Sequence, residues 1–183
     1  MVDNIITSRF NEIYDSTNKQ ALAYITAKCS NFEDVNDILQ ETYMELYDTM
    51  LKKGADYIDN AEAFVIELAK RKVYRHYTLI QRMKADMSLS VVTAAEEKEI
   101  IEYEISEMDL EESICTNELA AEIERLLQKK PQDIRKIFFL RFSLELTLGE
   151  IAELMGLGES QVKNKLYRTI NEIRTYYREG ESQ

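Results

Sequence analysis

The chain has 183 residues, few turn-forming residues and a formal net charge of −11. With only 5 glycines and 1 proline, it is predicted to be an all-α protein that is helical over nearly its whole length. The acidic balance argues against a protein that binds free DNA unaided, because non-specific affinity for DNA comes mostly from phosphate neutralisation. No run approaches the roughly 18 apolar residues of a membrane span, and the N-terminus lacks a signal-peptide pattern, so we expect a cytoplasmic protein without membrane insertion.

Residues suited to chemistry are few and scattered along the chain. Cys29 and Cys115 stand far apart, without a CxxC spacing or a histidine cluster, so neither a metal site nor a cofactor is predicted. His76 is the only histidine, and no nucleophile or ligand set lies near it in the sequence. We also find no glycine-rich phosphate loop and no nucleophile–base motif, so the sequence does not predict an enzyme.

The N-terminal stretch, residues 4–28, is predicted to form two helical segments on either side of the polar run DSTNKQ. Its apolar residues are expected to belong to the core of a scaffold. These core candidates are Phe10, Ile13, Tyr14, Leu22 and Ile25.

The following segment, NFEDVNDILQETYMELYDTM, is predicted to be a helix with two distinct faces. The broad apolar face comprises Phe32, Val35, Ile38, Leu39, Tyr43, Leu46 and Tyr47. A neighbouring face carries Asp37, Gln40, Glu41 and Met44 at positions i, i+3, i+4 and i+7. This mixed strip is suited to docking a partner helix, although a merely solvated acidic face would explain the charges equally well.

A polar loop over residues 52–60 precedes the next helix, which Asp59 or Asn60 is expected to cap. That helix interleaves basic and aromatic side chains, a combination suited to holding single-stranded DNA. The set comprises Lys70, Arg71, Lys72, Tyr74, Arg75, His76, Tyr77, Arg82 and Lys84. The alternative is a basic solvated helix whose tyrosines belong to the core.

Residues 85–118 hold eleven acidic side chains and one lysine, and their pattern is that of a linker. The default interpretation is a solubilising spacer. A second interpretation is an acidic chain that passes through a positively charged channel meant for nucleic acid. The chain then resumes with an apolar pattern typical of a small four-helix core, with Pro131 at a helix start. The expected core residues are Leu119, Ile123, Leu126, Leu127, Ile134, Ile137, Phe138, Leu140 and Phe142.

Residues 146–174 are predicted to form a helix-turn-helix, two helices joined by a glycine turn. Leu148, Ile151, Ala152 and Met155 fall at helical spacing, and Gly156 directly after them is suited to ending the first helix in the left-handed conformation. The second helix is predicted to begin near Gly158. Its apolar positions are Val162, Leu166, Ile170 and Ile173.

The other faces of this second helix are expected to meet DNA, with N-terminal side chains at base edges and later cations on phosphates. The residues assigned to this role are Ser160, Gln161, Lys163, Asn164, Lys165 and Arg168. Glu159, at the helix start, either stabilises that end through the helix dipole or accepts from a cytosine amino group. The alternative for the whole segment is an antiparallel helix pair with a solvated polar face.

Three motifs, DILQET at 37–42, EIAELMGL at 150–157 and VKNKL at 162–166, together resemble RNA polymerase sigma factors of the extracytoplasmic-function (ECF) type. The resemblance implies a region 2-like domain at 1–85, an acidic linker at 86–116 and a region 4-like domain at 117–183. Core RNA polymerase and promoter DNA are the implied partners, and an anti-sigma factor is a further one.

The resemblance also assigns roles to individual residues. Contact with polymerase is assigned to Asp37, Gln40, Glu41 and Met44, and the helix-turn-helix positions named above would read the −35 element. Contact with the −10 element is assigned to Asn60, Phe64, Lys70, Arg71, Tyr74 and Arg75. Two of these depart from the family pattern, since Phe64 replaces a frequent tryptophan and Arg71 replaces an asparagine. Phe64 can still stack on a base, whereas a polar contact at Arg71 does not carry over.

Two other functions remain open at this stage. The helix-turn-helix also resembles that of LuxR-type regulators, with residues 1–110 then acting as a sensor or dimerisation part. Charge argues against this alternative, because residues 119–183 hold 11 basic and 10 acidic side chains, whereas a regulator that binds DNA unaided usually has a basic domain. A helical adaptor without a DNA role is disfavoured by the basic face of the second helix.

Overall fold

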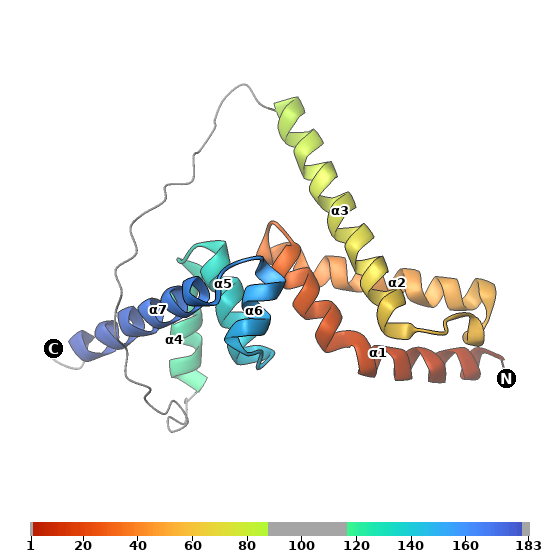
Figure 1. Cartoon of the computed structure of the whole chain (residues 1–183), viewed down its shortest axis with the longest axis horizontal. Helices are drawn as coiled ribbons and strands as arrows, with labels where there is room; N and C mark the ends of the chain where they lie inside the picture. Colours follow the sequence, from red (N-terminus) through yellow and green to blue (C-terminus); the bar gives the residue numbers. More distant parts are fainter. Residues whose placement is uncertain (1, 88–116, 181–183) are drawn as a thin grey trace.

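The computed structural model describes residues 2–87 and 117–180, and these ranges are helical apart from short connections, which confirms the all-α prediction (Figure 1). The α-helices are α1 (Val2–Lys28), α2 (Val35–Lys53), α3 (Ala61–Met87), α4 (Asn117–Gln128), α5 (Gln132–Phe138), α6 (Leu148–Met155) and α7 (Glu159–Gly180). Short 3₁₀ turns form η1 (Phe32–Asp34) and η2 (Ala55–Tyr57), and a π-helical turn forms η3 (Phe139–Ser143). Of the predicted linker, residues 88–116 lie outside the described residues. None of the helices described is both long and apolar enough to cross a membrane.

Helix α1 is continuous from Val2 to Lys28, so the predicted break at DSTNKQ is wrong. The hydroxyl groups of this run are satisfied within the helix: Ser16 and Thr17 both donate to the carbonyl of Ile13, at 3.1 and 2.6 Å. Thr17 also shares a hydrogen bond of 2.8 Å with the Tyr43 hydroxyl of α2. Because these two hydroxyl groups have partners, the weak helix propensity of Ser16 and Thr17 does not interrupt the helix.

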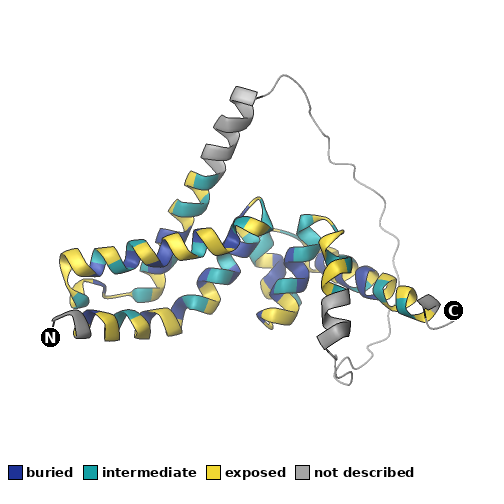
Figure 2. Ribbon diagram, turned by 180° about the vertical axis from the view of Figure 1, so that it is seen from behind, coloured by how far each residue is buried: buried dark blue, intermediate teal, exposed yellow. Residues whose placement is uncertain are grey.

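Helices α1, α2 and α3 pack on one another and form the N-terminal domain (Figure 1). Ile13, Leu46, Val65 and Leu68 are almost completely buried between them. The buried faces of the three helices turn toward each other, and the exposed faces point outward (Figure 2). Of the predicted core residues in α1, Ile13 and Ile25 are buried, but Tyr14 retains 37% exposure and lines a surface groove instead.

Helices α4 to α7 and the turn η3 form the C-terminal domain around a second core. Ile137, Leu140, Ile151 and Val162 are fully buried there, in agreement with the predicted pattern. Phe142, predicted to be core, is 53% exposed. Phe142 lies within the π-helical turn η3, where the regular α-helical spacing that the sequence prediction assumed does not hold.

The two domains also contact each other, a feature that the sequence did not predict. Helix α6 lies against the C-terminal half of α1, and Ala23 of α1 is buried in the core of the C-terminal domain (Figure 1). Beside this contact, η1 meets α5: the Phe32 amide donates to the Gln132 side chain at 3.0 Å, and Arg135 pairs with Glu33 at 2.7 Å. The packing therefore joins the domains through both apolar and polar contacts.

A buried lysine completes this junction. The ammonium of Lys136, on α5, donates to the backbone carbonyl of Cys29 just after α1, and the residue is only 7% exposed. Burial lowers the pKa of Lys136, because a low-dielectric environment disfavours the charged form. The carbonyl of Cys29 thus satisfies a group that would otherwise be costly to bury.

Candidate nucleic-acid and protein interfaces

The helix-turn-helix is formed by α6, Gly156 and α7. Thr147 caps α6 in a reciprocal arrangement with Glu150: the Glu150 amide donates to the Thr147 hydroxyl, and the Thr147 amide donates to the Glu150 carboxylate. Gly156 ends the helix at φ 70° and ψ 34°, as predicted. The Leu157 amide then donates to the carbonyl of Ala152 at 2.9 Å, which completes the turn. The Thr147-x-x-Glu150 signal in the sequence could have identified this start.

Helix α7 buries its apolar stripe and presents its polar residues to solvent. Val162, Leu166 and Ile170 are buried, as their spacing predicted. Five of the six side chains assigned to DNA are exposed, and Lys165 is partly exposed. The exposed five are Ser160, Gln161, Lys163, Asn164 and Arg168. The exposed face of α7 therefore contains amides toward its N-terminus and cations farther along.

Several of these side chains already have partners within the domain. Gln161 accepts from the Gly158 amide at 3.1 Å, so it caps the start of α7. Lys165 pairs with Asp133 of α5 at 2.6 Å. Arg168 pairs with Glu172 at 3.1 Å, and the Lys130 and Arg168 hydrogen bonds lower the pKa of Glu172. Contact with DNA at these positions would require the side chains to exchange partners.

The strip on α2 lies fully on the surface. Asp37, Gln40, Glu41 and Met44 are all exposed, and Met44 keeps 59% of its area accessible. Glu41 lies 3.7 Å from the ammonium of Lys72 on α3, so it is part of an ion pair across the two helices. Asp37, the other charged residue of the strip, makes no ion pair among the described residues.

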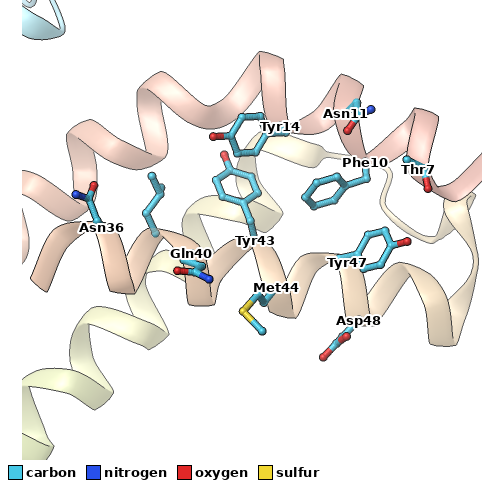
Figure 3. A pocket seen from close by; sticks show the side chains of 11 residues that line it. Thr7, Phe10, Asn11, Tyr14, Asn36, Gln40, Tyr43, Met44, Tyr47 and Asp48 are labelled. Carbon is cyan, nitrogen blue, oxygen red and sulfur yellow. The ribbon is translucent and has the colours of Figure 1, made fainter.

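A surface groove of about 620 Å³ runs between α1 and α2 beside this strip (Figure 3). Phe10 and Tyr14 come from α1, and Tyr43 and Tyr47 come from α2, so aromatic rings line its floor. The Phe10 and Tyr47 rings meet edge to face with centroids 5.2 Å apart. Gln40 and Met44 line its rim, so the strip and the groove form one surface. Phe10 and Tyr14 on α1, and Tyr43 and Tyr47 on α2, each stand at positions i and i+4. The sequence pattern indicated only that these residues face the core.

Helix α3 carries the residues assigned to the −10 element. The Asn60 side chain accepts from the Ala63 amide at 2.9 Å and so caps the helix, one of the two caps predicted. Phe64 is partly buried against the N-terminal core. Tyr74 is 73% exposed, which contradicts the alternative that it is a core residue. The side chains of Tyr77, Arg82 and Lys84 lie outside the described residues.

The cations of α3 differ in how strongly the protein holds them. Arg71 and Lys72 both pair with Glu45 of α2, at 3.3 and 2.8 Å, and only 11% of the Lys72 side chain is exposed. The hydrogen bond from Lys72 holds the pKa of Glu45 below its ordinary value. Lys70 pairs more loosely with Glu67 at 3.8 Å, and Arg75 is exposed. Lys72 is therefore a structural cation, whereas Lys70 and Arg75 lie on the open surface.

His76 has neighbours in the fold that it lacks in the sequence. Its Nδ1 lies 3.9 Å from the Oδ2 of Asp34, and the buried thiol of Cys29 completes a group whose ligand atoms all lie within 4.8 Å of one another. The residues come from three separate segments, the position directly after α1, the turn η1 and the middle of α3. Sequence spacing could not reveal this cluster, because 47 and 42 residues separate His76 from the other two members.

Residues 120–173 match the family model of sigma-70 region 4. The C-terminal domain is similar to sigma-70 region 4 over this range. The matched range includes α5, α6 and all six α7 residues that the sequence assigned to DNA. It confirms the resemblance to sigma factors for this part of the chain.

Two solved structures are similar to the chain at low sequence identity. A chain in the co-crystal structure of the sigma factor RpoE with the anti-sigma factor NepR from Bartonella quintana is 15% identical, with a TM-score of 0.46, and the match covers 92% of this chain and 96% of that one. A chain in the structure of the RsbN–BldN complex is 15% identical, with a TM-score of 0.34, covering 96% and 99%. Likeness at this level carries no functional conclusion. No curated protein sequence matches the chain.

Proposed function

We propose that the chain is an ECF-type sigma factor that binds core RNA polymerase and directs promoter recognition and transcription initiation. The observation that carries this proposal is the sigma-70 region 4 match over a helix-turn-helix whose second helix exposes amides and cations. The same match disfavours the LuxR-type alternative. No step of this function requires the protein to catalyse a reaction.

Promoter reading at the −35 element is assigned to α7. Gln161 and Asn164 stand near its N-terminus, where side chains of a recognition helix reach base edges in the major groove. Lys163 and Arg168 are exposed cations on the same helix and are suited to phosphate contacts. Lys165 contributes only if its ion pair with Asp133 opens.

Polymerase binding is assigned to the exposed strip on α2 and the aromatic groove beside it. An interface of this kind needs apolar contact area at its centre and polar groups at its rim. Met44 and the ring of Tyr47 offer apolar contact area. The polar groups at the rim are Asp37, Gln40 and Glu41. An acidic rim would also direct association toward a basic partner surface.

The exposed part of α3 is assigned to the melted −10 region. Tyr74 presents an aromatic ring to solvent, and Lys70 and Arg75 place cations on the same helix. Aromatic stacking with nearby cations is the usual way to hold single-stranded DNA. Phe64 is partly buried, so we expect it to contribute less to stacking than Tyr74. An anti-sigma factor remains a partner that only the sequence resemblance implies.

The test is transcription from a promoter library by core polymerase, with and without the purified chain. We expect specific transcripts only with both components, because a chain with a net charge of −11 should bind free promoter DNA poorly at physiological salt. Co-purification with core polymerase is measured in parallel. Tight, specific binding of a promoter duplex by the isolated protein, without binding to polymerase, would support the LuxR-type alternative.

A further inference from the structure

We propose that Cys29, Asp34 and His76 form a binding site for a divalent metal ion of the Zn²⁺ class. Their ligand atoms, one sulfur, one carboxylate oxygen and one imidazole nitrogen, all lie within 4.8 Å of one another. The site goes beyond the proposed function, which needs no metal. It also revises the sequence expectation that neither cysteine nor the histidine has a ligand neighbour.

The donor set determines the class of metal. Thiolate and imidazole are preferred ligands of Zn²⁺ and related borderline ions, whereas Mg²⁺ and Ca²⁺ require oxygen ligands throughout. In a tetrahedral zinc site neighbouring ligand atoms stand about 3.3–3.6 Å apart. The present separations, 3.9 Å between Asp34 and His76 and up to 4.8 Å within the group, therefore need small side-chain rotations to close around an ion. Three protein ligands leave a fourth position for water.

The Asp34 carboxylate is placed for this role rather than for capping. Asp34 ends η1 and directly precedes α2 with φ −84° and ψ −5°, whereas an aspartate whose side chain makes a capping hydrogen bond usually has an extended backbone. Its side chain makes no such hydrogen bond, and its Oδ2 lies near His76 instead.

The Cys29 thiol, which donates to the Asn31 carbonyl at 3.1 Å, would release its proton to solvent on binding an ion, and the charges that result are compatible with a divalent ion. Cys29 is 2% exposed, while His76 and Asp34 keep 30% and 26% of their side chains accessible, so the cluster opens to solvent on one side. A divalent ion bound by a thiolate and a carboxylate gives a group of zero net charge. The ammonium of Lys136, which donates to the Cys29 carbonyl, therefore faces no net positive group when the site is filled.

Metal binding would tie α3 to the segment on which the C-terminal domain rests. Residues 29–34 also contact α5, through Lys136 on the Cys29 carbonyl and through Arg135 on Glu33. An ion that joins Cys29 and Asp34 to His76 removes freedom from this segment. We therefore expect metal to raise the thermal unfolding midpoint, because a ligand that binds only the folded state stabilises it.

The experiment uses the full chain, stripped of metal with a chelator and titrated with Co²⁺ as a spectroscopic probe. We expect a thiolate-to-cobalt charge-transfer absorption that saturates near one equivalent and is displaced by Zn²⁺. The chain has only 2 cysteines, so Cys115→Ser is a matched control and should keep the full signal. Cys29→Ser should abolish it, and His76→Gln should weaken Co²⁺ binding at least about 10-fold.

The same titration identifies the results that would overturn the site. Absence of the absorption in the parent chain, its persistence in Cys29→Ser or its loss in Cys115→Ser would each refute the proposal. If Cys29→Ser does not fold by circular dichroism, Asp34→Asn and His76→Gln decide, since both side chains are partly exposed. Unchanged Co²⁺ affinity in both would refute it. The readout needs neither polymerase nor DNA, so its failure leaves the proposed function intact.

Discussion

At the residue scale, Gln161 has two roles that a single alanine substitution would confuse. Its Oε1 accepts from the Gly158 amide at 3.1 Å and caps α7, while its amide group lies at the end of the helix expected to meet base edges. Two substitutions separate these roles, because glutamate keeps the acceptor for the cap and removes the amide donor.

We expect Gln161→Ala to lower the free energy of unfolding by about 0.5–2 kcal/mol, as for other lost caps, and also to change promoter preference. Gln161→Glu should retain most of the stability and change only the preference, by about 1–3 kcal/mol at one or two base pairs. Chemical denaturation and transcription from a −35 library measure the two effects. Identical promoter preferences for the parent and both variants would show that Gln161 does not read the promoter.

Glu45 provides a second prediction at this scale, through the dependence of stability on pH. Its pKa is held below the ordinary 4.5, chiefly by the hydrogen bond from Lys72. The stabilisation is therefore complete above pH 4.5 and is lost as the pH falls through the lower pKa of the folded state. We expect Glu45→Gln to flatten the decrease in unfolding free energy over this acidic window.

The control for this prediction is the partner residue. Lys72→Met removes the main cause of the shift, so it should flatten the same window, and the double variant should add little to either single change. Chemical denaturation at a series of pH values between about 3 and 7, which includes the range in which carboxylates titrate, measures the slope of the unfolding free energy against pH for each variant. Additive effects of the two substitutions would mean that the pair does not account for the shift.

At the scale of single elements, the turn between α6 and α7 depends on one backbone conformation. Gly156 adopts φ 70°, and a Cβ built there would meet no atom within 4 Å, so substitution is penalised by backbone conformation alone. Gly156→Ala should therefore cost about 1 kcal/mol. Gly149 lies within α6, and a Cβ built there would meet only the Glu159 side chain, at 3.8 Å. Gly149→Ala should therefore leave the free energy of unfolding unchanged or raise it. Equal losses in thermal denaturation would contradict this reasoning.

The strip on α2 is tested by charge reversal at Asp37. This carboxylate makes no ion pair among the described residues, whereas reversal of Glu41 would also place a like charge 3.7 Å from Lys72. Asp37→Lys should weaken binding to core polymerase at least several-fold and leave the helical content unchanged, because rim charges affect association more than folding. Asp15→Lys, at an exposed position of α1 with no ion pair among the described residues, is the charge-matched control. Equal polymerase affinity in both variants would remove α2 from the interface.

At the scale of the whole molecule, the packing of the two domains depends on a short run of contacts between η1 and α5. The Gln132 side chain accepts a hydrogen bond from the Phe32 amide, and Arg135 forms an ion pair with Glu33. The ring centroids of Phe32 and Phe139 lie 5.4 Å apart. The double variant Gln132→Ala, Arg135→Ala should loosen this contact. We expect a larger radius of gyration in solution scattering with unchanged helical content.

The control for domain packing is Arg9→Ala, which removes a partly exposed cation whose ion pair lies within α1. It should leave the radius of gyration unchanged. An unaltered radius in the double variant would mean that the apolar contact of α6 with α1 suffices to hold the domains together.

Much of the architecture could be predicted from the sequence because it depends on local patterns. The apolar spacing of α7 and the glycine before it determine which face is buried and where α6 ends, and both predictions agree with the structure. The resemblance to sigma factors rested partly on the same segment and is confirmed there by the family match. The assigned polymerase and −10 contacts remain predictions.

Other features were decided only by tertiary structure. The Thr17 hydroxyl finds a partner in Tyr43 of another helix, and Phe142 lies exposed in a π-helical turn that its apolar spacing did not indicate. The aromatic groove between α1 and α2 and the cluster of Cys29, Asp34 and His76 each combine residues from separate segments. Hydrophobic periodicity specifies which face of a helix is buried, but the pairing of faces depends on packing over the whole chain, and distant side chains meet only once that packing exists.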